Sequence, residues 1–156
     1  MVAFTLNGVA TDAALPGEAS LLHALRGPLE LSGTRFGCGD EQCGACMVLL
    51  DGKPAYSCTL SLDAVAGRSV TTLEGIGTRE SPHAVQTALL EEQAGQCGFC
   101  LSGIIVSAAA LLADNPAPDE AAVKAALDKN LCRCGSHNRI VRAVLRAADA
   151  MREGAR

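Results

Sequence analysis

Apolar and polar residues alternate near the start of the chain, on both sides of the pair Asn7-Gly8. Alternation with a period of two is typical of a strand that buries one face. Asn-Gly favours a two-residue hairpin turn, because both turn positions need a positive φ. The pattern therefore predicts a β-hairpin over residues 2–13.

A second alternating stretch is centred on Asp51-Gly52. Residues 47–50 and 53–58 flank this pair, which predicts another hairpin. The β-branched residues between Ser69 and Leu73 indicate a closing strand.

The stretch between the two hairpins begins with a helix signal and ends in a loop. Ser20 can cap a helix whose apolar side chains, Leu21, Leu22 and Leu25, face inward. Glycines then recur from Gly33 to Cys46, and glycine permits the close backbone approaches of a tightly wrapped loop. The first half therefore predicts strands crossed by one helix, which is a small α+β unit.

The pattern changes from strands to helices near residue 77. Glycines and polar residues up to Pro82 predict a linker. Beyond it, apolar residues recur at helical spacing, with breaks rich in Gly, Asn or Pro. Four helices are predicted, over residues 82–93, 101–113, 119–128 and 137–152. Short loops favour antiparallel neighbours, so these helices predict a small bundle. We expect two domains, residues 1–77 and 78–156.

Composition and charge narrow the class of protein. Of the 156 residues, 49% are hydrophobic, which is enough to build a core. A net charge of -4 without a long basic run argues against a nucleic-acid partner. No charged and apolar leader opens the sequence, and the apolar run around Ile104 to Leu112 is too short to span a bilayer. We therefore expect a cytoplasmic protein without a membrane span.

Eight cysteines carry most of the chemistry of the chain. Without a secretion signal they should stay reduced, which favours metal ligation. A first set has gaps of four, two and eleven residues between its members, Cys38, Cys43, Cys46 and Cys58. The first two gaps are those of plant-type ferredoxins, which hold a 2Fe-2S cluster. Glycines at 37, 39 and 44 let backbone amides approach the cluster sulfurs.

The second set consists of two close pairs, Cys97 with Cys100 and Cys132 with Cys134. Each pair comes just before a predicted helix, so two helix N-termini can face one shared site. Four thiolates with two ferric ions and two sulfides sum to a negative charge, which suits the positive end of a helix. The spacing therefore predicts a second 2Fe-2S cluster.

Two other interpretations of the cysteines stay open at this point. Two structural zinc sites of four cysteines each are compatible with short cysteine pairs. A disulfide framework is arithmetically possible, because the cysteine count is even. The glycine-rich CxxxxCxxC loop is less typical of zinc, and the missing secretion signal disfavours disulfides.

Several residues near the cysteines allow more than one role. Phe36 and Phe99 either shield the clusters from water or pack in the core. We interpret His23, His83 and His137 as structural, because ligation by histidine would leave cysteines unused.

The sequence contains no visible site for substrate turnover. No Ser-His-Asp set, paired catalytic carboxylates or nucleotide motif is present. Gln96 precedes Cys97, and its amide can donate and accept hydrogen bonds toward a polar ring system, although such a glutamine is usually solvated. Clusters without a substrate site indicate an electron relay.

Four motifs resemble those of the iron-sulfur subunits of the xanthine oxidase family of molybdenum hydroxylases. They are Gly37-Cys38-Gly39, Cys43-Gly44-Ala45-Cys46, Gln96-Cys97-Gly98-Phe99-Cys100 and Cys132-Arg133-Cys134-Gly135. The resemblance covers nearly the whole chain. It implies a β-grasp ferredoxin domain with one 2Fe-2S cluster, followed by an all-α four-helix bundle with the other.

The resemblance also implies how the parts work together. The second cysteine set would lie nearest a molybdopterin cofactor held by a large partner subunit, and Gln96 and Cys134 would touch the pterin. The ferredoxin-type cluster would lie farther out, toward the electron acceptor. Two electrons from a hydroxylation at molybdenum would leave one at a time through the clusters. The chain would be an electron-transfer subunit of an oxidoreductase whose active site is on another chain.

One loop departs from the family pattern. Glycine is frequent in the family at the position of Glu41, while Gln42 before Cys43 is similar to the two-subunit isoquinoline 1-oxidoreductase and nicotinate dehydrogenase branch. That branch implies an N-heteroaromatic substrate, with an aldehyde as the other substrate class of the family. It also implies a cytochrome or other carrier as electron acceptor in place of a flavin subunit.

Two other functions are compatible with the cysteines. A free-standing two-cluster carrier would shuttle between enzymes and present a small, wet docking face. A zinc-stabilised interaction module would have no redox role and would be colourless.

Overall fold

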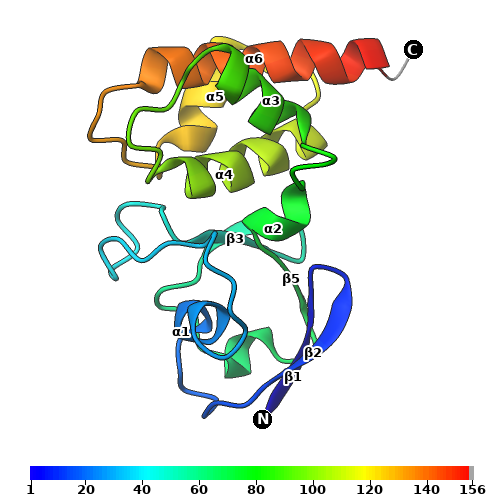
Figure 1. Ribbon diagram of the computed structural model, residues 1–156, viewed down its shortest axis with the longest axis vertical. Coiled ribbons are helices and arrows are strands. Elements are labelled where there is room, and N and C mark those ends of the chain that lie inside the picture. Colours follow the sequence, from blue (N-terminus) through cyan, green and yellow to red (C-terminus); the bar gives the residue numbers. More distant parts are fainter. Residues whose placement is uncertain (155–156) are drawn as a thin grey trace.

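The computed structural model describes residues 1–154. Figure 1 shows a sheet-containing part that carries the N-terminus and a helical part that ends the chain, one stacked on the other. Apolar side chains form two core clusters, one in each part.

The first strands form the predicted hairpin. β1 (Val2–Leu6) pairs antiparallel with β2 (Val9–Ala13), and Leu6 lies opposite Val9. The turn residues Asn7 and Gly8 have φ values of 50° and 84°, as such a turn requires. The prediction for residues 2–13 is confirmed.

The second hairpin is also present, but its strands are shorter than expected. β3 (Met47–Leu50) pairs antiparallel with β4 (Lys53–Tyr56). The predicted extension of the second strand to Cys58 is wrong, because the hydroxyl of Ser57 donates to the carbonyl of Cys46 at 2.7 Å and the chain turns there. This turn brings Cys58 back toward the start of β3.

One more strand completes a mixed sheet. β5 (Ser69–Thr71) runs parallel to β1 and antiparallel to β3, and the strand order is β2-β1-β5-β3-β4. The predicted strand to Leu73 is wrong at its end. The amide of Thr72 donates to Oδ1 of Asn7 at 2.8 Å, and a short helix, α2 (Leu73–Ile76), begins instead.

The first core lies under the sheet and is covered by α1 (Leu21–Arg26). Ser20 caps this helix as predicted, and its hydroxyl oxygen accepts the amide of His23 at 3.2 Å. Leu21 and Leu25 are fully buried, and burial of each contributes about 1.5–3 kcal/mol. A 3-10 turn, η1 (Asp63–Val65), packs Val65 into the same core.

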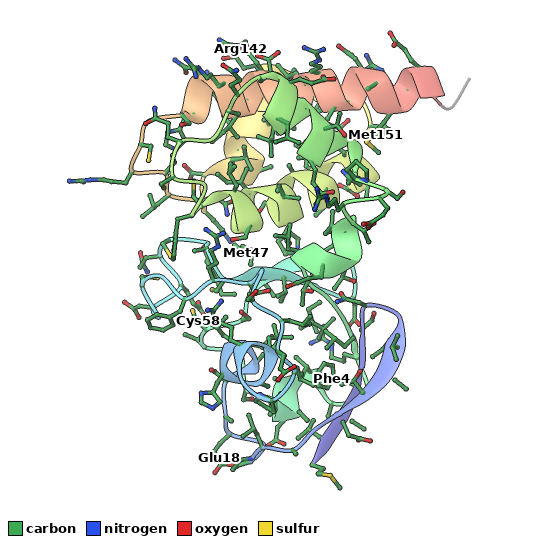
Figure 2. The ribbon with its side chains drawn as sticks, viewed as in Figure 1. Phe4, Glu18, Met47, Cys58, Arg142 and Met151 are labelled. Atoms are coloured by element: carbon green, nitrogen blue, oxygen red, sulfur yellow. The ribbon has the colours of Figure 1, made fainter. Side chains whose placement is uncertain are left out.

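Four longer helices follow, close to the predicted ranges. They are α3 (Ala84–Glu91), α4 (Leu101–Asp114), α5 (Glu120–Leu127) and α6 (His137–Gly154). Their apolar faces form the second core, which α2 also contacts through Leu73 and Ile76. On the outer side of α6, Arg142 pairs with Glu92 of the α3 end at 3.3 Å (Figure 2).

The two parts meet where α4 packs against β3. Met47, the first residue of β3, is buried between them (Figure 2). Because Cys46 directly precedes Met47, the first cysteine set lies close to this junction. Within residues 1–154, no helix is both long enough and apolar enough to cross a membrane.

Candidate iron-sulfur sites

The first cysteine set is assembled by the second hairpin and the loop before it. Met47 pairs with Tyr56 in the β3–β4 ladder, so residues just outside that pair meet at one end of the hairpin. Cys46 is one of those residues, and Cys58 lies two positions after Tyr56, with its side chain in hydrogen-bond contact with Cys46. Cys38 and Cys43 lie in the preceding loop and contact each other.

Backbone amides surround the sulfurs of this loop. Cys38 Sγ accepts the amides of Asp40 at 3.4 Å, Gln42 at 3.3 Å and Cys43 at 3.4 Å. Cys43 Sγ accepts the amide of Cys38 at 3.3 Å. A Cβ on Gly37 would lie 2.6 Å from Cys43 Sγ, so only glycine leaves this sulfur its place. The loop is therefore built to hold thiolates.

The thiols of this set differ in their acidity. Hydrogen bonds from the amides of Asp40 and Gln42 lower the pKa of Cys38 to about 7. Burial raises the pKa of Cys46 to about 11, because charge is costly away from water. The loop amides thus favour the thiolate form of Cys38, which is exposed to solvent. The buried Cys46 gains most from a positive metal atom that offsets its charge.

In the second set, each cysteine of the first pair contacts one cysteine of the second pair. Cys134 Sγ lies 3.5 Å from Cys97 Sγ, and Cys132 contacts Cys100 through their thiols. Cys97 and Cys100 end the loop before α4, whereas Cys132 and Cys134 lie between α5 and α6. Two sulfur contacts therefore join the loop before α4 to the segment between α5 and α6.

Local dipoles also favour thiolates at the second set. The amide of Phe99 donates to Cys97 Sγ at 3.5 Å, which lowers the pKa of Cys97. Burial opposes ionisation of Cys132, but hydrogen bonds led by the amide of Ser136 bring its pKa below the usual value. α4 and α6 begin just after the two pairs, so both helix N-termini add a positive field.

Both sets fit an iron-sulfur cluster. The structure describes all eight cysteines as free thiols, which stand for the thiolates that would bind iron. Each set has amide donors toward a sulfur, and in the first set Gly37 leaves room for Cys43 Sγ. Cluster sulfurs accept hydrogen bonds of this kind, and these bonds help to set the reduction potential.

The two sites are joined by direct contacts between their loops. The amide of Leu131, next to Cys132, donates to the carbonyl of Cys43 at 2.9 Å. Asn130 Nδ2 approaches the carbonyl of Gly44 at 3.4 Å, and Ser102 donates to the carbonyl of Ala45 at 3.3 Å. The ligand loops of the two sets are therefore one connected unit.

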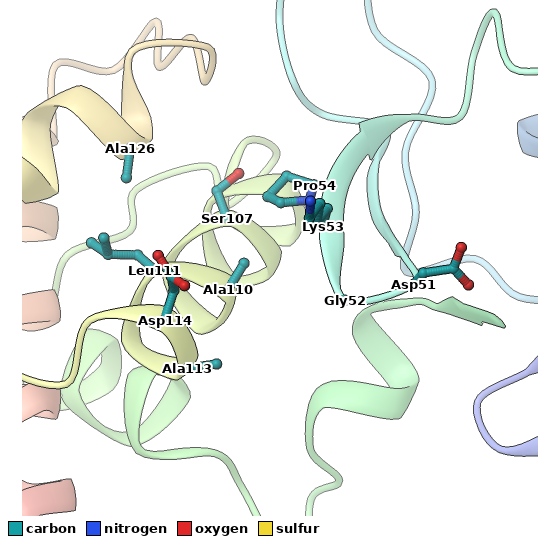
Figure 3. A pocket seen from close by; sticks show the side chains of 10 residues that line it. All are labelled: Asp51, Gly52, Lys53, Pro54, Ser107, Ala110, Leu111, Ala113, Asp114 and Ala126. Carbon is teal, nitrogen blue, oxygen red and sulfur yellow. The ribbon is translucent and has the colours of Figure 1, made fainter.

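An open groove of about 640 Å³ separates the β3–β4 turn from α4, and none of its lining residues is a cysteine (Figure 3). Asp51 points away from the helix in this view and pairs with Arg68 at 2.7 Å. Alanines and Leu111 of α4 supply much of the facing wall.

Comparison with known families and proteins identifies both halves of the chain. Residues 4–71 match the family described as "2Fe-2S iron-sulfur cluster binding domain", and residues 72–145 match the "[2Fe-2S] binding domain". The chain is 45% identical over 97% of its length to the A subunit of nicotinate dehydrogenase from Pseudomonas putida, and covers 97% of that protein. It is 48% identical to the alpha subunit of isoquinoline 1-oxidoreductase from Brevundimonas diminuta, over 95% of this chain and 97% of the relative.

A solved structure agrees with these relatives. A chain in the crystal structure of quinoline 2-oxidoreductase from Pseudomonas putida 86 superposes with a TM-score of 0.91 and 35% identity. The match covers 98% of this chain and 96% of that one. The chain belongs to the iron-sulfur subunits of the molybdenum hydroxylases. The predicted family and its branch are confirmed.

Membership of this subunit family decides the alternatives that the cysteines alone left open. The iron-sulfur subunit carries two 2Fe-2S clusters and serves electron transfer, and the active site of such an oxidoreductase is on another subunit. The zinc and disulfide interpretations are wrong. The prediction of two 2Fe-2S domains in an α+β chain is confirmed.

Some residues near the sites could be assigned only from the structure. Phe36 and Phe99 are 62% and 46% exposed, so neither packs in the core of the iron-sulfur subunit. Arg35 lies over the ring of Phe99 at 5.2 Å from its centroid, which ties the first loop to the second. His83 caps α3, whereas His23 and His137 are exposed.

The predicted pterin contacts lie at the surface. Gln96 is exposed and Cys134 is half-buried, both beside the second cysteine set. Sequence reasoning missed the roles of Asn130 and of Glu41, whose carboxylate accepts the hydroxyl of Thr59. The sequence signal for the positive φ of 53° at Glu41 is its place in the loop between Cys38 and Cys43.

Proposed function

We propose that this iron-sulfur subunit passes electrons from a molybdopterin site on a large partner chain to an external acceptor. The contact between the two ligand loops, Leu131 amide to Cys43 carbonyl at 2.9 Å, carries this proposal. A relay needs its two centres at a fixed separation. This contact joins Leu131, which precedes Cys132 of one set, to Cys43 of the other set. Both relatives are named as subunits, which supports a partner chain.

The proposed ligands are the two sets of four cysteines. Cys38, Cys43, Cys46 and Cys58 would hold one cluster, and Cys97, Cys100, Cys132 and Cys134 would hold the other. Each cluster, when bound, takes up and releases one electron at a time. The chain orients the sulfurs, donates amides to them and covers Cys46 from water.

The second set is proposed to face the pterin. Gln96 offers both a donor and an acceptor at the surface beside Cys97, which suits the edge of a polar ring system. Phe99 and Leu131 are 46% and 60% exposed next to the same cysteines. Apolar side chains at the surface around a redox site favour a permanent interface with the large subunit.

The first set is proposed to face the acceptor. A surface pocket of about 320 Å³ is lined by Cys58, Phe36, His23 and Arg26, among others. Because a ligand sulfur lines this pocket, a carrier docked there would be only a short electron-transfer distance from that cluster. A cytochrome or another protein carrier is the proposed acceptor.

The relatives guide the proposals on substrate, location and architecture. Nicotinate and isoquinoline enzymes favour an N-heteroaromatic substrate over an aldehyde, and eight free thiols favour the cytoplasm. The β1–β5 sheet with α1 is proposed to be a β-grasp, and α3 to α6 a four-helix bundle. The proposed domain boundary stays at residue 77, just after α2.

Coexpression with the candidate large subunit tests the function. We expect the two chains to copurify with molybdenum, and a stable, soluble monomer that never binds the large chain would instead favour the free-standing carrier. In the complex, Cys43→Ser should remove the ferredoxin-type signal and slow electron delivery to the acceptor, while substrate still reduces molybdenum in a single turnover. Loss of that single-turnover reduction in a folded complex would contradict the relay order.

A further inference from the structure

The loop that carries Cys38 and Cys43 has an unusual residue at its tip. Glu41 has a φ of 53°, in the left-handed region, where a side chain costs about 1–2 kcal/mol. Asn7 and Asp51 share such angles in the hairpin turns, where asparagine and aspartate are common. Glu30 and Gln93 also have positive φ values, of 55° and 47°, and Glu41 is distinguished by a carboxylate that bonds to a distant segment.

The compensating contact lies across the site. The carboxylate Oε1 of Glu41 accepts the hydroxyl of Thr59, 18 residues away in the sequence. Thr59 directly follows Cys58, the proposed fourth ligand. The bond therefore ties the loop with three cysteines to the segment with the fourth.

The peptide group that follows Glu41 is one of those that donate to the sulfur. The amides of Asp40 and Gln42 donate to Cys38 Sγ at 3.4 and 3.3 Å. The Gln42 amide belongs to the peptide group that Glu41 shares with Gln42, so its direction depends on the left-handed turn at Glu41. A contact that fixes Glu41 thus also fixes the direction of the Gln42 amide.

We infer that Glu41, held by Thr59, is a positioning residue that sets the reduction potential of the ferredoxin-type cluster. Glu41 has two opposite effects on this potential. Amides directed at Cys38 Sγ favour the reduced, more negative cluster and raise the potential, whereas the carboxylate charge opposes reduction and lowers it. The inference rests on the proposed ligand set Cys38, Cys43, Cys46 and Cys58.

Redox titration of the purified complex, followed by electron paramagnetic resonance, separates the two effects for each cluster. Thr59→Val keeps the shape of the side chain but removes the hydroxyl. We expect a lower potential of the ferredoxin-type cluster, with a roughly threefold change in its oxidised-to-reduced ratio at the wild-type midpoint, the size expected for one hydrogen bond. The other cluster should titrate as in the wild type.

Matched variants complete the test. Thr59→Ser keeps the hydroxyl and should restore the wild-type potential. Glu41→Gln keeps an acceptor for Thr59 without the charge and should raise the potential. Asp40→Asn removes a neighbouring negative charge and should also raise the potential if charge alone acts.

Three results would overturn the inference. They are an unchanged potential in Thr59→Val, equal shifts at both clusters, and the same effect of Thr59→Ser and Thr59→Val. The ligand assignment fails separately, if wild-type protein lacks a ferredoxin-type signal or if Cys43→Ser retains it.

Discussion

Single glycines decide how closely the two ligand loops approach each other. Gly44 follows Cys43 with a φ of 71°, and a Cβ there would lie 2.3 Å from the carbonyl oxygen of Lys129. The same carbonyl-rich junction contains Gly103, whose Cβ would lie 1.9 Å from the carbonyl oxygen of Gly44. A larger residue at Gly44 would push the loop of Cys43 away from Lys129, and one at Gly103 would push α4 away from Gly44.

Gly44→Ala should therefore destabilise the iron-loaded protein. Gly67→Ala is the matched control, because Gly67 has a φ of 70° and a Cβ added there would meet nothing within 4 Å. Both variants carry the cost of a left-handed alanine, but only Gly44→Ala adds a steric clash. We expect an additional loss of about 1–3 kcal/mol in the free energy of unfolding, measured in urea. Equal losses in the two variants would contradict the close approach.

Residue spacing predicts the two cysteine sets, but not the contacts that join their loops. Spacing alone groups the eight cysteines, since ligand gaps follow from cluster geometry. Asn130 and Arg35 have no comparable signal. Each acts across more than 60 positions of sequence, on Gly44 and on Gly98 respectively, and a single sequence contains no record of such pairs.

The helices and strands followed the patterns wherever local chemistry decided them. Turn pairs at Asn7-Gly8 and Asp51-Gly52, and the cap at Ser20, are local signals, and the structure confirms all three. α2 was missed because its start depends on the long-range bond from the Thr72 amide to Asn7. The early end of β4 likewise depends on Ser57 reaching Cys46.

The start of α3 makes a pH-dependent contribution to stability. His83 Nδ1 accepts the amide of Val85 at 3.2 Å, and the backbone amide of His83 donates to Gln86 at 2.7 Å. Burial lowers the pKa of His83, because the charged imidazolium is poorly solvated there. Protonation would also turn the accepting nitrogen into a donor and break the cap.

Because the folded pKa lies below the unfolded value of about 6.5, the unfolded chain binds the proton more readily. The stabilisation is complete above that value and is lost as the pH falls below it. We expect wild-type protein to lose about 1 kcal/mol more than His83→Ser between pH 7.5 and 5.5, the typical worth of a cap. Serine caps without titrating, so parallel losses in urea unfolding would contradict this role.

At the scale of the whole molecule, two small cores support one shared redox unit. The sheet core and the helical core are separate clusters, yet both ligand loops lie at the junction between them. Composition and patterning predicted the two parts and their order along the chain. Their mutual placement could not be predicted, because it depends on α4 packing against β3 and on backbone contacts that any residue type can make.

The central claim is that the cysteines divide into two sets of four, each holding two irons bridged by sulfide. Iron and acid-labile sulfide analysis, combined with electron paramagnetic resonance of the reduced protein, tests it directly. We expect about four irons and four sulfides per chain, and two distinct paramagnetic centres. A single centre, or zinc without labile sulfide, would contradict the claim.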